Sequence, residues 1–311
     1  MYSRWVDCHI GMFHTFRRPP YGGSNQFFLA LKKELSRRKY LVRPNCIKRN
    51  TKGAIVNAFA FDNKLLRKLR NDGCRIIHRV VGPVSIYRGT DDRTADIYQW
   101  EMNREFADAT VFQSQYSYNA YTKIEFQFKS PVVIMNAVDP DVFHPGEKRK
   151  LSRGKIRLIT TSWSDNLNKG ADTYKWLDEN LDWERYEFIF VGRISSEFKN
   201  IRVIPPVHPK KLAALLRDSD IYITASLYDT CSNALIEALA CKLPAIFAIS
   251  GGNGEIAKRG GFGFHEKDEI PALLDRLIDE YEDRQRMISI PSLAKVADRY
   301  LSTMGLPNYN F

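Results

Sequence analysis

The most restrictive feature of this sequence is an alternation of short apolar runs with segments of helical periodicity. Runs of roughly four to eight apolar residues predict buried strands, and apolar residues three and four positions apart predict the helices that connect parallel strands. In the first half, helices are predicted over residues 25–38 and 63–71. The predicted strands of this half are WVDCHIGMF, YLVRP, AIVNAFAF, CRIIHRVV, ATVFQS and PVVIMNAV.

The second half repeats the pattern. Its predicted strands are IRLITTSW, YEFIFVG, IRVIPP, IYITAS and PAIFAI. Its predicted helices cover residues 169–180, 209–219 and 232–241, followed by terminal segments over about 271–287 and 292–304. A polar stretch at 140–155 with Pro145, Gly146 and a run of charges is typical of a linker. We therefore predict two doubly wound α/β domains, 1–147 and 148–290, facing a central cleft that holds the chemistry.

Cysteine usage and hydropathy favour a soluble protein of a reducing compartment. The five cysteines are odd in number and contain no CxxC pair, which argues against a disulfide framework and against a zinc site. They are Cys8, Cys46, Cys74, Cys231 and Cys241. No window approaches the roughly 18 consecutive apolar residues of a membrane span, and the opening MYSRWVDCHIGMF is too polar for the core of a signal peptide. We therefore expect a cytoplasmic location.

The net charge of +11 is confined to the first half of the chain. Residues 1–150 contain 26 Lys and Arg against 14 Asp and Glu, whereas residues 151–311 contain 21 against 22. Such an asymmetry favours an anionic partner for the first domain, such as a phosphate compound, an acidic membrane surface or nucleic acid, although a merely solvated basic surface is the alternative. The sequence contains no recognisable helix-turn-helix, RNA-binding or zinc signature, so nucleic acid is the least favoured of these partners.

Two segments have the character of anion-binding loops. Gly22 and Gly23 precede a predicted helix, where glycines let backbone NH groups approach an anion closely, although ordinary turn formation explains a glycine pair equally simply. Lys169 and Gly170 open another predicted helix. A lysine at the positive end of a helix opposes the helix dipole and is explained by a bound diphosphate, or by neutral drift because the cost is small.

The most informative segment is SLYDTCSNALIEALAC, which starts at Ser226 after a predicted strand. Asp229 lies in the loop, and Glu237 lies eight positions later inside an apolar helix. A carboxylate flanked by Ile236, Ala238 and Leu239 is seldom buried without a partner, so we interpret Glu237 as a hydroxyl-binding group rather than a surface residue. The free NH groups at the start of this helix would bind phosphate.

These motifs resemble those of the retaining glycosyltransferases of family 4. The resemblance rests on YGGSNQF at 21–27, NAVDPDVFHP at 136–145, NKG at 168–170 and DTCSNALIEALACKLP at 229–244, in this order along nearly the whole chain. It implies a GT-B fold of two Rossmann-like domains, in which residues 291–311 return to the first domain. It also implies a nucleotide-diphosphate sugar as donor. Because the sequence contains no clear DxD pair, we expect no metal or other cofactor.

The resemblance also implies roles for particular residues. Lys169 would contact the donor diphosphate, Asp229 the transferred sugar, and Glu237 the ribose. His78 would lie beside the sugar, with the adjacent Arg79 and the pair Gly82-Pro83 as competing candidates. Further donor contacts would come from Gly22, Gly23 and the backbone amides of Thr230, Cys231, Ser232 and Asn233.

Three departures from the family pattern concern the same site. Asp229 stands where the family has glutamate, Trp163 where it has arginine, and Lys242 where it has glycine. Neutralisation of the diphosphate would then depend on Lys169 and a second cation, for which Arg193 is the candidate. The segment GTDDRTAD does not form a metal-binding pair by its pattern, and we interpret its acids, Asp91, Asp92 and Asp96, as solvated loop residues.

The implied activity is transfer of a sugar to an acceptor hydroxyl with retention of configuration. The acceptor would be a glycan or a lipid-linked sugar bound by the basic first domain, with peripheral contact to an anionic membrane face. Polysaccharide or glycolipid assembly is the corresponding biological role. The alternatives are a nucleotide-sugar epimerase or phosphorylase of the same fold, and a nucleic-acid-binding protein.

Overall fold

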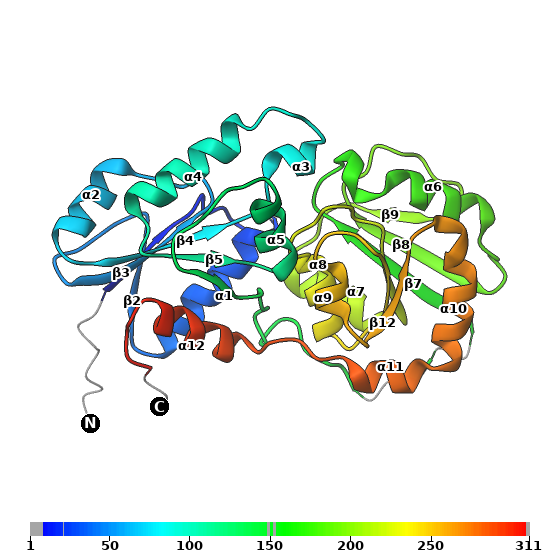
Figure 1. Cartoon of the computed structure of the whole chain (residues 1–311). Coiled ribbons are helices and arrows are strands. Elements are labelled where there is room, and N and C mark those ends of the chain that lie inside the picture. Colours follow the sequence, from blue (N-terminus) through cyan, green and yellow to red (C-terminus); the bar gives the residue numbers. More distant parts are fainter. Residues whose placement is uncertain (1–8, 21, 148–149, 152–153, 309–311) are drawn as a thin grey trace, which may run out of the picture. The chain divides into compact units, whose positions relative to one another are not determined.

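The structure is a computed structural model that describes residues 9–20, 22–147, 150–151 and 154–308. Part of the predicted strand WVDCHIGMF, Cys8, Tyr21 of the glycine loop and four linker residues between 148 and 153 lie outside these residues. Internal contacts divide the chain into two compact units (Figure 1). Unit 1 contains the chain up to Arg17, Ser24–Asn136 and the segment from Pro291 onward; unit 2 contains Arg18–Gly23 and Ala137–Ile290. The domain limits 1–147, 148–290 and 291–311 stay predictions.

Unit 1 is built on a six-stranded parallel sheet with the order β2-β1-β3-β4-β5-β6. The strands are β1 (His9–Phe13), β2 (Leu41–Pro44), β3 (Thr51–Asn57), β4 (Arg75–Val80), β5 (Ala109–Phe112) and β6 (Pro131–Val133). The helices are α1 (Gly23–Arg37), α2 (Asn63–Asn71), α3 (Val84–Arg88), α4 (Thr94–Phe106), α5 (Gln115–Lys123) and α12 (Leu293–Thr303). The chain reverses its direction of progress across the sheet between β1 and β3, which makes this pair the topological switch point.

Unit 2 has a six-stranded parallel sheet with the order β12-β11-β10-β7-β8-β9, which is the Rossmann order with its switch point between β7 and β10. The strands are β7 (Ile156–Ser162), β8 (Tyr186–Gly192), β9 (Arg202–Ile204), β10 (Ile221–Thr224), β11 (Ala245–Ala248) and β12 (Gly261–Phe264). The helices are η1 (Leu167–Lys169), α6 (Ala171–Asn180), α7 (Pro209–Asp218), α8 (Asn233–Ala240), α9 (Asn253–Ala257), η2 (Lys267–Glu269), α10 (Ile270–Asp279) and α11 (Tyr281–Met287).

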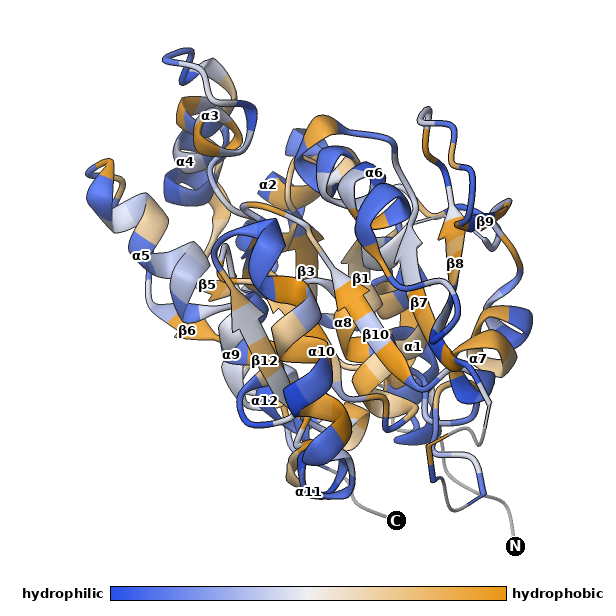
Figure 2. Ribbon diagram, turned by 90° about the vertical axis from the view of Figure 1, so that its right-hand side faces the viewer, coloured by the Kyte–Doolittle hydropathy of each residue, from blue (hydrophilic) through white to orange (hydrophobic). Residues whose placement is uncertain are grey.

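Apolar strands form the centre of each unit. Figure 2 shows β7, β8 and β10 coloured mainly as hydrophobic, with polar residues on the helices around them. Phe188, Ile221 and Ile223 are at most 2% exposed in the core of unit 2, where Leu177 and Leu274 from α6 and α10 pack against them. This is the arrangement of a sheet with both faces covered, in which strands lose the alternation of polar and apolar residues.

The prediction of two doubly wound parallel units is confirmed, and most predicted strands are present within a few residues. Strand β12 was not predicted, because its segment GFGF lacks the β-branched run on which strand prediction depends. A side chain at Gly261 is excluded, since an added Cβ would lie 1.9 Å from the carbonyl oxygen of Ala245 on β11. No helix in the described part of the chain combines the length and the apolar character that a bilayer crossing requires.

Gly170, between η1 and α6, has a conformation and a packing that only glycine satisfies. Its φ is +81°, and an added Cβ would lie 2.3 Å from Cβ and 2.6 Å from the carbonyl oxygen of Ala225, which follows β10. We expect Gly170→Ala to lower the free energy of unfolding by about 2–4 kcal/mol through left-handed strain and overpacking. Gly254→Ala is the control in the same unit, because an added Cβ meets nothing within 4 Å there. Equal midpoints of the two variants in urea unfolding would contradict this account.

Candidate functional site

Lys169 and Asp229 form an ion pair at the carboxyl ends of β7 and β10. Nζ of Lys169 lies 2.8 Å from Oδ2 of Asp229, and both side chains are about one-fifth exposed. The two residues are 60 positions apart in the chain, and they meet because β7 and β10 are neighbours at the switch point of the sheet. Ligands of open α/β sheets bind at this point, so the pair occupies the expected place for a ligand site.

The loop that carries Asp229 is held by the segment Ser250–Asn253, which follows β11. The NH of Gly252 donates to the carbonyl oxygen of Asp229 at 2.8 Å, and Oγ of Ser250 accepts from the NH of Tyr228 at 2.9 Å. The buried amide of Asn253 donates to the carbonyl oxygens of Ser226 and Ala248, which ties the end of β10 to the end of β11. These bonds hold Asp229 in place before any ligand arrives.

Helix α8 begins directly after this loop. Ser232 is its N-cap, and the serine Oγ accepts from the NH of Leu235 at 3.3 Å. The NH of Cys231 donates to Oδ1 of Asp229 at 3.3 Å. The first turn of any helix has NH groups without intrahelical partners and carries a partial positive charge, so Thr230 to Asn233 form a suitable surface for a phosphate.

Glu237 lies on α8 and is 7% exposed. Its carboxylate makes no hydrogen bond or ion pair with any residue that the structure describes. Burial raises the pKa of Glu237 to about 8, because an ionised carboxylate loses its hydration there. A buried carboxylate without a protein partner is expensive, and a ligand hydroxyl that donates to it would remove much of that cost.

Trp163 and Arg193 lie together at the carboxyl ends of β7 and β8. The guanidinium carbon of Arg193 is 4.5 Å from the centroid of the Trp163 ring, which is the geometry of a cation–π contact. The NH of Arg193 also donates to the carbonyl oxygen of Ser162 at 3.0 Å. The tryptophan that replaces the arginine of the family pattern therefore holds another arginine at the same end of the sheet.

Gly22 and Gly23 belong to the contacts of unit 2 rather than unit 1. An added Cβ at Gly22 would lie 3.7 Å from Cδ1 of Trp163, and one at Gly23 would lie 2.6 Å from Nδ2 of Asn233. Close approach requires the absence of a side chain at Gly23, which lies beside the predicted donor-binding residue Asn233, whereas a Cβ at Gly22 would be at ordinary contact distance from Trp163.

His78, our candidate for a catalytic histidine, has a structural role instead. It lies within β4 and is fully buried, with Nε2 2.9 Å from the carbonyl oxygen of Ala58 and Nδ1 3.1 Å from Nδ2 of Asn103. Burial lowers the pKa of His78 to about 4 and thereby keeps the ring neutral. Both ring nitrogens have hydrogen-bond partners and no ring atom is exposed, so the ring cannot contact a sugar. The structure does not support the predicted catalytic role of His78.

The competing candidate, Arg79, is the centre of a buried polar network at the carboxyl ends of the strands of unit 1. Its guanidinium donates to Oδ1 of Asn57 and Oε1 of Gln113, each at 2.6 Å, and to Oδ1 of Asn136 at 2.8 Å. The guanidinium also lies 5.0 Å from the ring centroid of Phe27. This extensive anchoring makes Arg79 a fixed positive charge in the core of unit 1.

His14, which the sequence analysis did not single out, completes this network at the β1–β3 switch point. Nδ2 of Asn57 lies 3.0 Å from Nδ1 of His14, and Oδ1 of Asn57 accepts from Arg79, so the amide donates to Nδ1. Burial and the charge of Arg79 lower the pKa of His14 to about 4, so the ring is neutral and carries its proton on Nε2. That Nε2–H is buried and has no acceptor among the described residues.

The acids of GTDDRTAD differ in part from the predicted solvated loop. Asp92 is exposed and accepts from Thr94 at the start of α4, as expected for a loop acid. Asp96 is fully buried, because it lies in the first turn of α4 and accepts from the NH groups of Val84 and Ser85 at 2.7 and 3.0 Å. It fixes the start of α3 and is not a solvated residue.

Comparison with solved structures identifies the fold. The sucrose-phosphate synthase of Thermosynechococcus elongatus aligns with a TM-score of 0.72 and 12% identity, over 94% of this chain and 97% of that chain. HepE of Anabaena, solved in complex with UDP-glucose, aligns with a TM-score of 0.70 and 13% identity, over 96% of this chain and 99% of that chain. The catalytic domain of starch synthase IV from Arabidopsis thaliana, bound to ADP and acarbose, aligns with a TM-score of 0.68 and 13% identity, over 96% and 98%. The chain therefore has the fold of the GT-B glycosyltransferases, as predicted.

Sequence comparison identifies the family signature. Residues 198–290, which contain Asp229 and Glu237, match the family model described as "Glycosyl transferases group 1". A "Probable sucrose-phosphate synthase" of Thermosipho melanesiensis is 26% identical over 212 residues, 60% of this chain and 48% of its own length. A protein of Sulfolobus islandicus rod-shaped virus 1 is 24% identical over 203 residues, 60% of this chain and 53% of its own length. The chain thus spans about half the length of the curated relatives it matches, and its second unit has the sequence signature of the group 1 glycosyl transferases.

Proposed function

We propose that this protein is a retaining glycosyltransferase that moves a sugar from a nucleotide diphosphate to an acceptor hydroxyl. The observation that carries this proposal is the buried Glu237 carboxylate without a partner among the described residues, which lies on α8 within the segment that matches group 1 glycosyl transferases, directly after the loop that holds the Lys169–Asp229 ion pair. HepE with bound UDP-glucose and starch synthase IV with bound ADP, which share the fold, support a nucleotide-diphosphate sugar as donor.

In this proposal, different residues of unit 2 contact different parts of the donor. Glu237 accepts hydrogen bonds from the vicinal ribose hydroxyls, and Lys169 leaves Asp229 to bind the diphosphate. Arg193 supplies a second positive charge, and the amides at the start of α8 supply neutral donors. Together they stabilise the negative charge that develops on the leaving diphosphate, which is the main requirement for breaking the glycosidic bond.

The acceptor is assigned to unit 1, at the carboxyl ends of its strands, where the neutral His14 interacts with the fixed positive charge of Arg79. A glycan or a lipid-linked sugar is the proposed acceptor, and the role is in polysaccharide or glycolipid assembly. In the retaining reaction the departing phosphate oxygen takes the acceptor proton, so no separate strong base is needed at this position.

A thermal-shift screen against UDP, GDP, ADP, TDP and CMP tests the donor site. We expect one nucleoside diphosphate to raise the melting temperature, because a ligand that binds only the folded state stabilises it by mass action. The same screen identifies the base. The absence of a shift with every nucleotide would contradict a preformed donor site, and consumption of the sugar nucleotide without any acceptor would point to an epimerase.

We propose that the reaction needs no metal ion. The cationic side chains of Lys169 and Arg193 are expected to perform the charge neutralisation that a divalent ion performs in other transferases. Transfer and the nucleotide-induced thermal shift are both expected to be unchanged by EDTA. A loss of either that magnesium or manganese restores would show that the two side chains are insufficient.

A further inference from the structure

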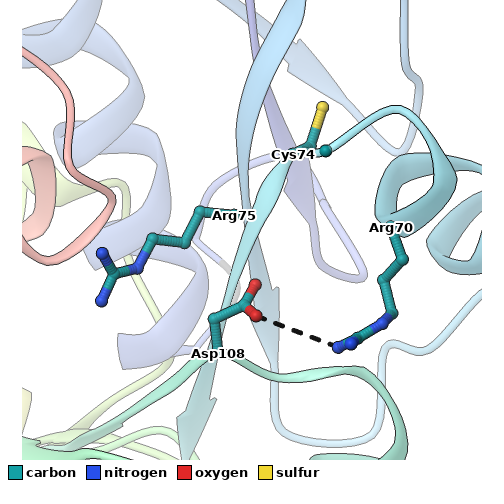
Figure 3. A pocket seen from close by; sticks show the side chains of 5 residues that line it. Arg70, Cys74, Arg75 and Asp108 are labelled. Atoms are coloured by element: carbon teal, nitrogen blue, oxygen red, sulfur yellow. Dashed lines mark ion pairs between the residues drawn. The ribbon is translucent and has the colours of Figure 1, made fainter.

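Unit 1 has a cavity at the amino ends of its strands, the opposite edge of the sheet from His14 and Arg79. The cavity has a volume of about 460 Å³ and is lined by Arg70, Gly73, Cys74, Arg75 and Asp108 (Figure 3). It lies where α2 ends, β4 begins and the chain enters β5. Its volume falls within the range of roughly 300–1,000 Å³ that is usual for small-molecule sites.

Two arginines flank the single carboxylate of this cavity. Figure 3 shows the guanidinium groups of Arg70 and Arg75 on opposite sides of Asp108. Arg75 is exposed and makes no hydrogen bond or ion pair with any residue that the structure describes. Its Nη1 stands beside the chain after α12, 3.6 Å from the position that a Cβ on Gly305 would take.

Asp108 does not neutralise both arginines, because one of its oxygens accepts a backbone hydrogen bond and the other lies far from the nearer guanidinium. Its Oδ2 accepts from the NH of Ile76 at 2.7 Å, and its Oδ1 is 3.9 Å from Nη1 of Arg70, a long distance for an ion pair. Arg70 Nη1 donates instead to the carbonyl oxygen of Phe106 at 3.1 Å. The remaining NH groups of Arg70 and all those of Arg75 are therefore available to a ligand.

Further cations interact with residues that line the cavity. Lys129 is partly buried, and its pKa is lowered by burial first and by the charge of Arg70 next. Lys129 interacts with Arg70, Arg104 and the acid Asp108, and Cys74 interacts with Lys52 and the acid Asp72. The cavity thus lies in a region where cations exceed carboxylates.

We propose that this cavity binds a phosphate-bearing anion, as a site separate from the donor site of unit 2. Guanidinium groups bind phosphate oxygens through pairs of parallel NH donors, and two arginines on either side of one ligand would hold it bidentately from both sides. A phosphate monoester and the phosphate of an anionic lipid headgroup both have this chemistry.

The test is calorimetric titration of the whole chain with inorganic phosphate. We expect saturable binding that Arg70→Gln with Arg75→Gln weakens about tenfold or more, because charge-assisted hydrogen bonds are lost. Arg75→Gln alone should weaken binding in the same direction, and it breaks no bond in the described structure. The Lys169→Ala variant should bind phosphate at this cavity with the affinity of the native protein. This result would show that the measured phosphate binding does not occur at the donor site of unit 2.

The matched control is Arg43→Gln with Lys64→Gln, two exposed cations that do not line the cavity, one on β2 and the other in the first turn of α2. Co-sedimentation with phosphatidylcholine vesicles, with and without phosphatidylglycerol, distinguishes the two sources of the anion. Loss of both phosphate and vesicle binding in the double variant identifies a lipid headgroup, and loss of phosphate binding alone identifies a soluble phosphate ester. Unchanged phosphate affinity in Arg70→Gln with Arg75→Gln, or no saturable binding to the native chain, overturns the proposal.

Discussion

Glu237→Gln is expected to stabilise the ligand-free protein at alkaline pH and to abolish tight binding of nucleoside diphosphates. The pKa of Glu237 is raised to about 8, above the ordinary value of 4.5 that the unfolded chain has. The folded protein is therefore favoured at low pH, where the carboxyl is protonated, and loses stability as pH rises from about 4.5 through about 8. Above that range the cost is on the order of a few kcal/mol.

The neutral amide removes this cost without leaving a cavity. We expect Glu237→Gln to melt roughly 5 °C or more above the native protein near pH 9, and at nearly the same temperature near pH 5. Because ribose hydroxyls favour the ionised carboxylate, the affinity of the native protein for its nucleotide should rise by up to about fivefold between pH 7 and 8. The variant should lack this dependence.

Glu179→Gln on α6 is the matched control, since Glu179 is exposed. Melting curves and nucleotide titrations over this pH range measure both effects. A variant that binds the nucleotide as tightly as the native protein would refute the assignment of Glu237 to the ribose. A variant that loses binding but gains no stability near pH 9 would show that the buried, ionised Glu237 carboxylate does not destabilise the folded protein.

Lys169→Ala is expected to weaken nucleoside diphosphate binding by about 10- to 100-fold and to reduce transfer further, by about 100- to 1,000-fold. The second effect exceeds the first because the charge on the diphosphate grows as the glycosidic bond breaks. Lys175→Ala on α6 removes an exposed lysine of the same unit and should change neither quantity.

Asp229→Asn provides the informative comparison. In the ligand-free protein Lys169 is held by Asp229 at 2.8 Å, so neutralising the acid releases the lysine for the diphosphate. We expect this variant to bind the nucleotide at least as tightly as the native protein and yet to transfer sugar slowly. Equilibrium binding and single-turnover transfer measure the two properties separately. Loss of binding in Asp229→Asn would show that the carboxylate itself contacts the nucleotide.

The polar groups at the two switch points show which features could be predicted from the sequence and which could not. Lys169 and Asp229 could each be identified from local pattern, because glycine and helix-start signals mark their loops. Their contact across 60 positions depends on β7 lying next to β10, which no local pattern specifies. His14, by contrast, has no sequence signal beyond its place after an apolar strand.

The choice between His78 and Arg79 could not be made from the sequence. Successive residues of a strand point to opposite faces of the sheet, and both faces of β4 are buried. Hydropathy therefore does not show which of the two residues, His78 or Arg79, belongs to the polar network. The side chains of Asn57, Gln113 and Asn136, each from a different segment, place Arg79 in that network.

Local hydrophobic patterns were sufficient to predict the two doubly wound units, because the period of hydrophobicity is a property of each segment and persists in any arrangement of the segments. The sequence also predicted the loops around Lys169 and Asp229 and the unusual burial of Glu237. Which of these polar groups have hydrogen-bond or ion-pair partners could be learned only from the three-dimensional arrangement of the segments. That distinction depends on strand order and on distances of a few ångströms between segments far apart in the chain. It identifies the Glu237 carboxylate, Nε2 of His14 and the Arg75 guanidinium as groups without a hydrogen-bond or ion-pair partner among the described residues.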